Sequence, residues 1–562
     1  MLDPAPKAVS TLEETRAESG PAMIDARYSF GAFGAEEQPN SKIVLGYRFP
    51  GTVPEYKWQF FGNQKPIPSE RPRYNPIEDG YTQNYEIWFR FGHEAALPEL
   101  LKNNVRWSWD VLHPALTPID VEVARRALID QLASRVVTIN GLTGIPFIES
   151  TKTGEVWPGS RGPSWSGTTG PDWWWRAIMG FVGKNVEAAN QLLIEADRDP
   201  GPRGRHMRQL AYQIIATFIE KCPMSPPAGS GFNLQTGKPS MTNPQWNTWY
   251  LRAPTDDMRM LMEAWEREGK QGREHPEWIA WCKSFADWLL TQQRANGSFP
   301  RGWRPGTGEV VEASGTTSYN VVPLFLLLSR DTGDSRYYDA AVRAAEYSWQ
   351  NFGARGIFVG GAIDNPNITD KEAGLLSLEA YLALYESTHD AKWLARSQAA
   401  ADFAESWIWL WNVPMPPDAS DDELMWKKGV STVGLQGITA AVPGGADEFL
   451  DWSAPAYAKL YIYTKDPHYL EVARLLLHNT KGMLALPGRT YGMLGPGWQT
   501  EHWNMSASPH IGRGFGEPEK WMPWITVNHL VSITGLEAVD PQLFRELSTP
   551  PASVGASAHV FR

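Results

Sequence analysis

A short turn recurs three times in the second half of this chain. Its copies begin at Asp331, Thr388 and Thr464 and read DTGDSRYYDAA, THDAKWLARS and TKDPHYLEVA. In each copy, Thr or Asp can accept the free N–H groups at the start of a helix, and an aromatic residue two or three positions later can anchor that helix to its neighbour. The pattern indicates a repeated unit of two helices joined by a short turn, with a looser fourth copy at His275.

Apolar residues at helical spacing predict a series of helices around these turns. The expected segments are 119–137, 172–182, 186–196, 207–220, 255–268, 277–294, 316–329, 335–351, 370–387, 392–411, 449–464, 467–484 and 521–534. Six hairpins that close on themselves form an (α/α)6 toroid, and an open solenoid is the competing arrangement. Because the connections differ greatly in length, we expect a mainly α protein with an (α/α)6 toroid.

The N-terminal part has a different pattern. Its β-type runs, Lys42–Phe49, Tyr56–Phe61 and Tyr85–Phe91, are separated by clusters of Pro, Gly and Asn. We therefore expect five regions along the chain. They are an irregular leader at 1–27, a small β-rich region at 28–95, a linker helix within 96–118, the catalytic toroid at 119–540 and an irregular tail at 541–562.

Composition excludes some classes of function. The net charge of −11 argues against a nucleic-acid partner, because phosphate backbones are held by clusters of Lys and Arg. Cys222 and Cys282 are too few for a disulfide framework. The first 22 residues contain no apolar core region, so the chain as given predicts neither a secretory signal nor a membrane partner. Its compartment and a homo-oligomeric state stay open.

Long connections alternate with the short turns. They are rich in Gly, Pro and Trp and span 155–171, 225–254, 295–315, 353–369, 412–448 and 485–520. In a toroid this alternation places all long connections on one rim, where residues far apart in sequence can converge, and connections of this length are usually functional. The chain has 27 tryptophans, and flat aromatic rings suit the apolar faces of sugars, so we expect a carbohydrate substrate in a groove on this rim.

Four carboxylates on the long connections are the candidate catalytic residues: Glu501, Glu372, Asp364 and Asp370. A glycosidase needs one carboxylic acid to protonate the leaving oxygen and one carboxylate as base or nucleophile. Helix capping is the alternative role for Asp370, and for Asp256, because each follows Thr at an expected helix start. Glu501 lies among tryptophans, away from any expected helix start, where an aromatic wall can raise its pKa.

Other residues on these connections are candidates for substrate binding. The arginines could hold an anionic sugar through their planar guanidinium groups, which suit a carboxylate better than Lys does. The aromatic and remaining polar residues could position the ring. The full set is His502, Tyr319, Trp303, Trp503, Arg161, Trp165, Arg252, Asp257, Arg304 and Glu312.

Other chemistries leave weaker signals in the sequence. No Gly-x-Ser-x-Gly elbow, P-loop or dinucleotide-binding glycine motif stands out, and no His-Glu-x-x-His pair is present. His502 and His510 could bind a metal ion, but no third ligand follows at a fixed spacing. The sequence therefore predicts no metal and no cofactor.

The turns of the type Thr-x-Asp-x-x-Tyr/Trp-Leu-x-x-Ala resemble the six-hairpin glycosidase superfamily across roughly 119–536. Within it, four motifs resemble a bacterial group identified with the β-glucuronidases of glycoside hydrolase family 154. They are Gly144-Ile-Pro, Met179-Gly-Phe-Val-Gly-Lys-Asn, Asp364-Asn-Pro with Asp370-Lys-Glu-Ala-Gly, and Gly497-Trp-Gln-Thr-Glu-His-Trp. This resemblance implies a toroidal hydrolase that acts on a glucuronide. The superfamily also contains unsaturated uronyl hydrolases, which use aspartates on the comparable rim.

The expected function is a glycoside hydrolase that removes a terminal sugar, with a uronic acid as the sugar. Glu501 and Glu372 are the expected acid and base or nucleophile, and Asp364 and Asp370 are their substitutes. One alternative is a polysaccharide lyase in which Tyr319 or His502 abstracts a proton beside a uronate carboxylate. The other alternative is a glycan-binding protein without catalytic activity.

Overall fold

The computed structural model describes a large part of the chain. The described residues are 24–25, 32–39, 42–48, 53–57, 67–71, 73–74, 88, 90–156, 174–241, 247–363, 368–413, 421, 426–438, 445–501, 503–504 and 520–549. Helices dominate from residue 97 onward, while strands are short and lie in the N-terminal part or between helices.

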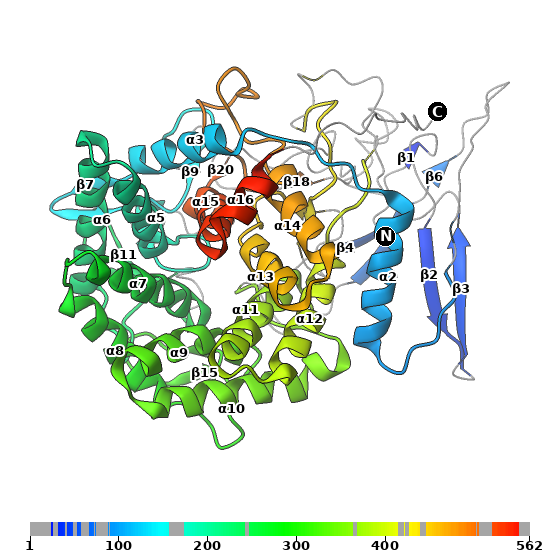
Figure 1. Ribbon diagram of the computed structural model, residues 1–562, viewed down its shortest axis with the longest axis horizontal. Coiled ribbons are helices and arrows are strands. Elements are labelled where there is room, and N and C mark those ends of the chain that lie inside the picture. Colours follow the sequence, from blue (N-terminus) through cyan, green and yellow to red (C-terminus); the bar gives the residue numbers. More distant parts are fainter. Residues whose placement is uncertain are drawn as a thin grey trace.

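Six helices form an inner ring (Figure 1). They are α5 (Asn185–Arg198), α7 (Arg252–Lys270), α9 (Val321–Thr332), α11 (Lys371–Thr388), α13 (Ala454–Thr464) and α15 (Pro523–Val539). Each contacts the next one along the chain, and α15 also contacts α5. That last contact closes the ring, so the structure is a toroid and the open solenoid is excluded.

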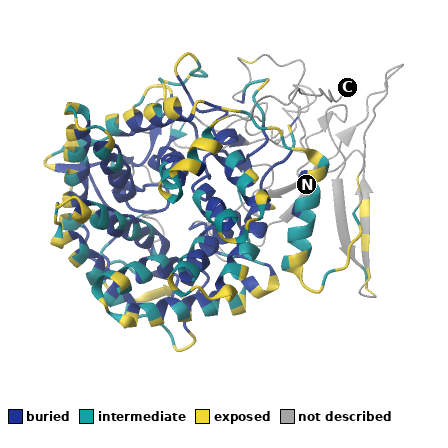
Figure 2. Ribbon diagram, in the orientation of Figure 1, coloured by how far each residue is buried: buried dark blue, intermediate teal, exposed yellow. Residues whose placement is uncertain are grey.

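An outer helix follows each inner helix. The outer helices are α6 (Pro202–Lys221), α8 (Pro276–Leu290), α10 (Ser335–Asn351), α12 (Ala391–Glu405), α14 (Pro467–Asn479) and the short α16 (Pro541–Ser548). In addition, α3 (Val121–Ser134) packs on α15, and α2 (Leu97–Leu112) packs on α12. Buried residues concentrate where the two layers of helices face each other (Figure 2). The predicted (α/α)6 fold class is confirmed.

The three recurrent turns connect α9 to α10, α11 to α12 and α13 to α14, and they share one geometry. The threonine hydroxyl donates to the carbonyl four residues earlier and accepts the N–H of the aspartate two residues later. The aspartate side chain then accepts an N–H in the first turn of the outer helix. Thr332, Thr388 and Thr464 play the first role, and Asp334, Asp390 and Asp466 the second.

An aromatic residue anchors each outer helix, as the sequence predicts. Tyr337, Trp393 and Tyr469 are all buried at the start of α10, α12 and α14. The looser fourth copy, between α7 and α8, differs. The His275 side chain makes no capping hydrogen bond, and its ring stacks on Trp278 at 4.0 Å instead.

The strands are short and form eight small sheets among the described residues. The N-terminal strands are β1 (Ile24–Asp25), β2 (Ala32–Glu37), β3 (Ile43–Arg48), β4 (Val53–Lys57), β5 (Ile67–Arg71) and β6 (Arg73–Tyr74). The pairs β2–β3 and β4–β5 are antiparallel, and β1 pairs with β6 in parallel. The predicted run Lys42–Phe49 corresponds to β3, and Tyr56–Phe61 overlaps β4 only at its start.

The remaining strands lie between helices. They are β7 (Val137–Ile139), β8 (Leu142–Gly144), β9 (Glu149–Ser150), β10 (Arg176–Ile178), β11 (Gly231–Asn233), β12 (Pro239–Ser240), β13 (Trp249–Tyr250), β14 (Gly302–Trp303), β15 (Val310–Glu312), β16 (Gln436–Gly437), β17 (Gly445–Asp447), β18 (Trp503–Asn504) and β20 (Lys520–Trp521). Two 3₁₀ turns, η3 (Ser318–Asn320) and η4 (Gly353–Arg355), flank α9 and α10.

Some expectations for individual segments are wrong. The described part of 172–182 is not a continuous helix, because residues 176–178 form β10 and pair with β11. The described residues of the run Tyr85–Phe91 do not form a strand. The tail after residue 540 begins with α16 instead of irregular chain, since Asp540 caps a helix that packs on α15. The region boundaries themselves stay a prediction.

Candidate active site

The starts of the inner helices share one rim of the toroid. Each inner helix ends at a short connection to its outer partner, so the longer segments lead from the outer helices to the starts of the next inner ones. Residues just before and within the first turns of α5, α7, α9, α11, α13 and α15 therefore face the long connections. This is the rim on which the sequence predicts the functional residues.

Arg252 is the centre of the charged groups on this rim. It is the first residue of α7, its side chain is only 2% exposed, and it donates from Nη1 to the Glu372 carboxylate on α11. Its Nε lies 3.2 Å from Oδ2 of Asp256, and Nη1 also donates to the Gly361 carbonyl at 2.8 Å. Because α9 lies between α7 and α11 in the ring, the contact between Arg252 and Glu372 crosses the interior of the ring.

Two aromatic residues lie beside this arginine, and a third packs against one of them. The Arg252 guanidinium lies 4.9 Å from the ring centre of Phe181 and 6.0 Å from that of Trp452. Trp524, in the first turn of α15, packs against Phe181 at 5.0 Å. We call Arg252, Asp256, Glu372, Phe181, Trp452 and Trp524 the central cluster. It joins the starts of α7, α11, α13 and α15 to the segment before α5.

Two glycines allow these segments to approach closely. Gly180 has a φ of +57°, and a Cβ there would lie 2.1 Å from the Ala253 carbonyl oxygen, at the start of α7. A Cβ on Gly361 would lie 2.3 Å from the backbone nitrogen of Ala373, in the first turn of α11. Larger residues at either position would push Phe181 or the Gly361 carbonyl away from Arg252.

Asp370 fixes the start of α11. Its Oδ1 accepts the N–H of Ala373 at 2.7 Å, and its Oδ2 accepts the N–H of Gly361 at 2.9 Å. Burial and, secondarily, the neighbouring Glu372 raise the pKa of Asp370 to about 7, against the two backbone donors and Arg252. Asp370 therefore does cap α11, as considered from the sequence, and its side chain also connects α11 to the segment that precedes the helix.

Asp256 differs from Asp370 in this respect. Because α7 begins at Arg252, Asp256 lies one turn inside the helix and caps nothing there. Its side chain is 14% exposed, compared with 3% for Glu372, so it is the more accessible carboxylate of the two. The capping role considered for Asp256 is wrong, because the helix starts four residues earlier than its Thr-Asp step suggests.

Tyr319 and Asp257 lie beside the central cluster, and each is hydrogen-bonded to the backbone of a neighbouring segment. The Tyr319 hydroxyl donates to the Val359 carbonyl at 3.2 Å, and burial together with the nearby Asp370 raises the pKa of Tyr319 well above its usual range. Asp257 accepts the N–H of Val186, near the start of α5, at 2.9 Å. Burial and then Glu187 raise the pKa of Asp257 to about 8. Both residues hold segments of the rim together.

Glu501 and Trp503 lie on a different part of the rim. The Glu501 N–H donates to the Lys520 carbonyl at 3.0 Å, and the Lys520 Nζ is 2.9 Å from Oε2 of Glu501. The Trp503 indole N–H donates to Glu448 at 3.2 Å. The two expected catalytic acids thus have different cationic partners, Lys520 for Glu501 and Arg252 for Glu372.

A buried polar network connects the long segment before α15 to the starts of α13 and α15. Gln499 donates to Glu448 and lies 2.5 Å from Nε2 of His529, whose Nδ1 is 3.1 Å from Asp451. Asp451 also accepts from Lys481 at 2.6 Å. Burial raises the pKa of Glu448 to about 8, and burial lowers the pKa of Lys481 and of His529.

Trp303, Arg304 and Glu312 are held in other contacts. Trp303 is fully buried and stacks on Trp249 at 4.7 Å, so its ring cannot cover a sugar. Glu312 pairs with the buried Arg301 at 2.9 Å, and Arg304 forms a surface ion pair with Glu309 at 2.7 Å. The remaining expected site residues, Asp364, His502, Arg161 and Trp165, lie outside the described residues.

The sequence predicts Arg252 and Glu372 as site residues but not as a pair, and it misses Phe181, Trp452 and Trp524. The available signal was position, because these aromatic residues lie just before or within the first turn of an inner helix. Within the described residues, no three His, Cys, Asp or Glu side chains gather in a way that could hold a metal ion. None of the described helices is long and apolar enough to cross a membrane.

Comparisons with known proteins identify similar folds at low similarity. No protein-family model and no curated protein matches the chain. Among solved structures, a D-mannose isomerase matches at 10% identity and a TM-score of 0.47, over 74% of this chain and 97% of that one. A cellobiose 2-epimerase from Spirochaeta thermophila matches at 13% and 0.47, over 79% and 99%. An unsaturated glucuronyl hydrolase specific for heparin matches at 12% and 0.41, over 79% and 98%. At these values, none of them assigns a reaction to this chain.

Proposed function

We propose that this protein is a glycoside hydrolase that removes a terminal sugar from a glycan or glycoside, and that the sugar is a uronic acid such as glucuronate. The supporting observation is the central cluster. Arg252 contacts two carboxylates, Asp256 and Glu372, from two different inner helices, with Phe181 and Trp452 around the guanidinium. Paired carboxylates beside aromatic rings are the groups that glycoside hydrolysis requires.

The uronate preference is supported by the free donor of Arg252. Its Nε and Nη1 have partners, whereas Nη2 has no hydrogen-bond partner among the described residues. A guanidinium held rigidly on two sides can offer its remaining N–H groups to a sugar carboxylate. A neutral sugar would leave this donor without an anionic partner.

Two carboxylates would carry the reaction. We assign one role to Glu372, and the other to Asp256, because both contact the same guanidinium and Asp256 is the more accessible. One would protonate the leaving oxygen, and the other would act as base or nucleophile. Glu501 is the alternative to Asp256, and Asp364 and Asp370 are the substitutes expected from the sequence. Asp370 has both oxygens engaged by backbone N–H groups and fits a positioning role.

The lyase alternative is less well supported. A lyase needs a side chain that removes a proton from the carbon beside the uronate carboxylate. The Tyr319 hydroxyl already donates to the Val359 carbonyl, and its raised pKa makes the phenolate scarce at neutral pH. Tyr319 is therefore a poor base in this environment.

The test is a panel of aryl glycosides that includes a β-glucuronide, measured with wild-type protein and the variants E372Q, D256N and E501Q. We expect release of the aryl group from the glucuronide, strong loss in E372Q and D256N, and activity in E501Q. Loss in E501Q with activity in D256N would transfer the second role to Glu501. An ultraviolet absorbance from a new double bond, or no cleavage of any glycoside, would overturn the proposal.

The matched control is E379Q. Glu379 lies on the same helix as Glu372 and pairs with Arg259 on α7, in the way that Glu372 pairs with Arg252. The control therefore removes an equivalent carboxylate of α11, one that also pairs with an arginine of α7 but lies away from the rim.

NMR of the freshly released sugar gives the anomer that is formed first. The anomer decides whether the two carboxylates retain or invert the configuration.

A further inference from the structure

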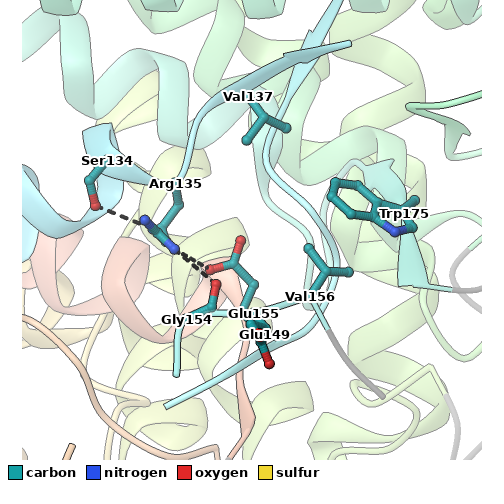
Figure 3. A pocket seen from close by; sticks show the side chains of 8 residues that line it. All are labelled: Ser134, Arg135, Val137, Glu149, Gly154, Glu155, Val156 and Trp175. Atoms are coloured by element: carbon teal, nitrogen blue, oxygen red, sulfur yellow. Dashed lines mark hydrogen bonds and ion pairs between the residues drawn. The ribbon is translucent and has the colours of Figure 1, made fainter. Parts of the chain in front are cut away.

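A cavity of about 540 Å³ lies at the outer edge of the same rim (Figure 3). It is bordered by the end of α3, by β7 and by the residues after β9. Its main polar and aromatic side chains are Arg135, Glu149, Glu155 and Trp175. The cavity belongs to the rim because β9 pairs with β20, which leads directly into α15.

Arg135 is fixed on one side of the cavity. Its guanidinium lies 5.4 Å from the ring centre of Trp498, its Nε donates to Ser134 at 3.2 Å, and its Nη1 donates to Glu149 and to the Gly154 carbonyl, both at 3.1 Å. Its Nη2 has no hydrogen-bond partner among the described residues. A guanidinium held in this way presents a donor in a fixed direction, at little further cost in conformational entropy.

Two carboxyl groups lie near this donor. Glu149 is only 2% exposed, and burial raises its pKa to about 7 against the opposing effect of Arg135. At neutral pH it can therefore donate as well as accept a hydrogen bond. Glu155 is exposed, and its carboxylate accepts a long hydrogen bond from the Thr153 hydroxyl at 3.4 Å. The cavity thus offers donors and acceptors in a balanced set.

Trp175 lies across the cavity from Arg135, with Val137 and Val156 close to the open space between them (Figure 3). Its side chain is half-buried, and its indole N–H has no hydrogen-bond partner among the described residues. An aromatic ring opposite a fixed guanidinium and carboxyl groups is the combination that a pyranose requires, because one face of that ring is apolar and its edge carries hydroxyls.

We propose that this cavity binds a neutral hexopyranose unit of a glycan chain, at a distance from the bond that is cleaved. This inference rests on the proposed function for the direction in which the glycan lies. The terminal sugar of the glycan would occupy the central cluster, and the rest of the glycan would run outward along the rim. The connection is short, since Trp521 of β20 pairs with Glu149, and Trp524 of the central cluster follows three residues later. A neutral sugar fits better than an anionic one, because two carboxyl groups face a single arginine.

The first test compares long and short substrates. In W175A we expect the KM for an oligosaccharide of the cleaved glycan to rise about tenfold, because the sugar loses the flat ring that covers its apolar face. The kcat/KM for the aryl glycoside should stay at the wild-type value. W175F, which keeps a flat ring, should restore part of the KM. The control is W265A, because Trp265 is a half-buried tryptophan on α7 outside this cavity.

The second test measures binding without catalysis. Isothermal titration of oligosaccharides into E372Q should show binding that is weakened about tenfold by adding W175A and is unchanged by adding W265A. Equal affinity and equal KM in W175A and wild type would overturn the subsite. If W175A does not fold, the same two measurements are made on E155Q, because Glu155 lines the cavity and its exposed side chain can be changed without disturbing the fold. Failure of the proposed function would appear separately, as no hydrolysis of any aryl glycoside by wild-type protein.

Discussion

Arg252 and Arg259 occupy equivalent positions two helical turns apart on α7, and each pairs with a glutamate on α11. Arg252 contacts Glu372 and Arg259 contacts Glu379, so two ion pairs, one after the other, connect the same two helices. Each arginine also pairs with an acid four residues later on α7, at 3.2 Å in both cases. The Arg252 side chain is 2% exposed and that of Arg259 is 27% exposed, so the ion pair on the rim is the more enclosed of the two.

The first prediction concerns activity. E372Q should lower kcat/KM for the preferred glycoside by about 10²–10⁴-fold, which is the usual contribution of a positioned acid or base. E379Q should retain activity close to wild type, because Glu379 lies away from the rim. Steady-state kinetics on both variants gives the comparison. Equal losses in the two variants would mean that the ion pairs act only on the fold.

The second prediction concerns stability. R252M should lower the free energy of unfolding by about 3–5 kcal/mol, because it leaves the buried Glu372 without its cation. R259M should cost about 1 kcal/mol or less, since its side chain is more exposed and the pair is screened by solvent. Urea denaturation of the two variants measures the difference. A larger loss in R259M would contradict this ranking of burial.

The third prediction concerns pH. The folded-state pKa of Asp370 is raised to about 7, from an ordinary value of 3.8, by burial and then by Glu372, while Arg252 opposes the shift. The folded state therefore binds more protons than the unfolded state between these values, so the stabilisation from this group is complete below pH 3.8 and is lost as pH rises through 7. The unfolding free energy should fall with rising pH by up to about 1.4 kcal/mol per unit for this group.

The D370N variant isolates that contribution. Its amide cannot titrate, so the difference in unfolding free energy between wild type and D370N should shrink from pH 4.5 to pH 7.5. Other buried carboxyls with raised pKa values, such as Glu149 and Asp402, remain in both proteins and cancel in the difference. Parallel pH profiles for the two proteins would show that Asp370 stays ionised in the fold.

The fourth prediction concerns the buried network at Lys481. K481M removes the cation 2.6 Å from Asp451 and leaves that buried carboxylate with the His529 ring, 3.1 Å away, whose pKa burial lowers. The loss in unfolding free energy should be about 3–5 kcal/mol, and the double variant K481M/D451N should be more stable than K481M alone, because the uncompensated charge is gone. A double-mutant cycle by urea denaturation measures the coupling. Additive losses would indicate that the two charges do not interact.

The fifth prediction concerns the recurrent turns. D466A should lower the unfolding free energy by about 1 kcal/mol through loss of the cap on α14. It should lower the melting temperature more than D390A does, because Asp466 also accepts from Arg106 at 3.2 Å, whereas Asp390 lies on the surface. Thermal unfolding of the two variants shows which one has the lower melting temperature. Neither variant should change kcat/KM, since both turns lie on the rim opposite the central cluster.

The fold could be predicted because its signals are local. Each Thr-x-Asp turn and its aromatic anchor lie within about ten residues, and the geometry is decided by capping and burial over that range. The helix expected at 172–182 is wrong because apolar and aromatic residues suit a buried strand as well as a helix, and here β10 pairs with β11.

The site could be predicted only in part. Arg252 and Glu372 are 120 residues apart, and nothing in the sequence near either one specifies the other as its partner. The sequence predicts that Trp303 binds substrate because it lies on the Gly/Pro/Trp-rich connection 295–315, but its partner in the core, Trp249, lies more than fifty residues earlier. Long-range packing decides both outcomes, and single-sequence patterns do not contain it.

The contact between α15 and α5 also has a consequence during synthesis on the ribosome. The first and last inner helices must meet, so the inner ring can close only after residues 523–539 have emerged. Until then the nascent chain is an open arc whose interior faces, with the pairs at Arg252 and Arg259, lack their final enclosure. Such late, non-local closure slows folding and exposes apolar surface, so we expect chaperones to engage this chain before translation of α15 is complete.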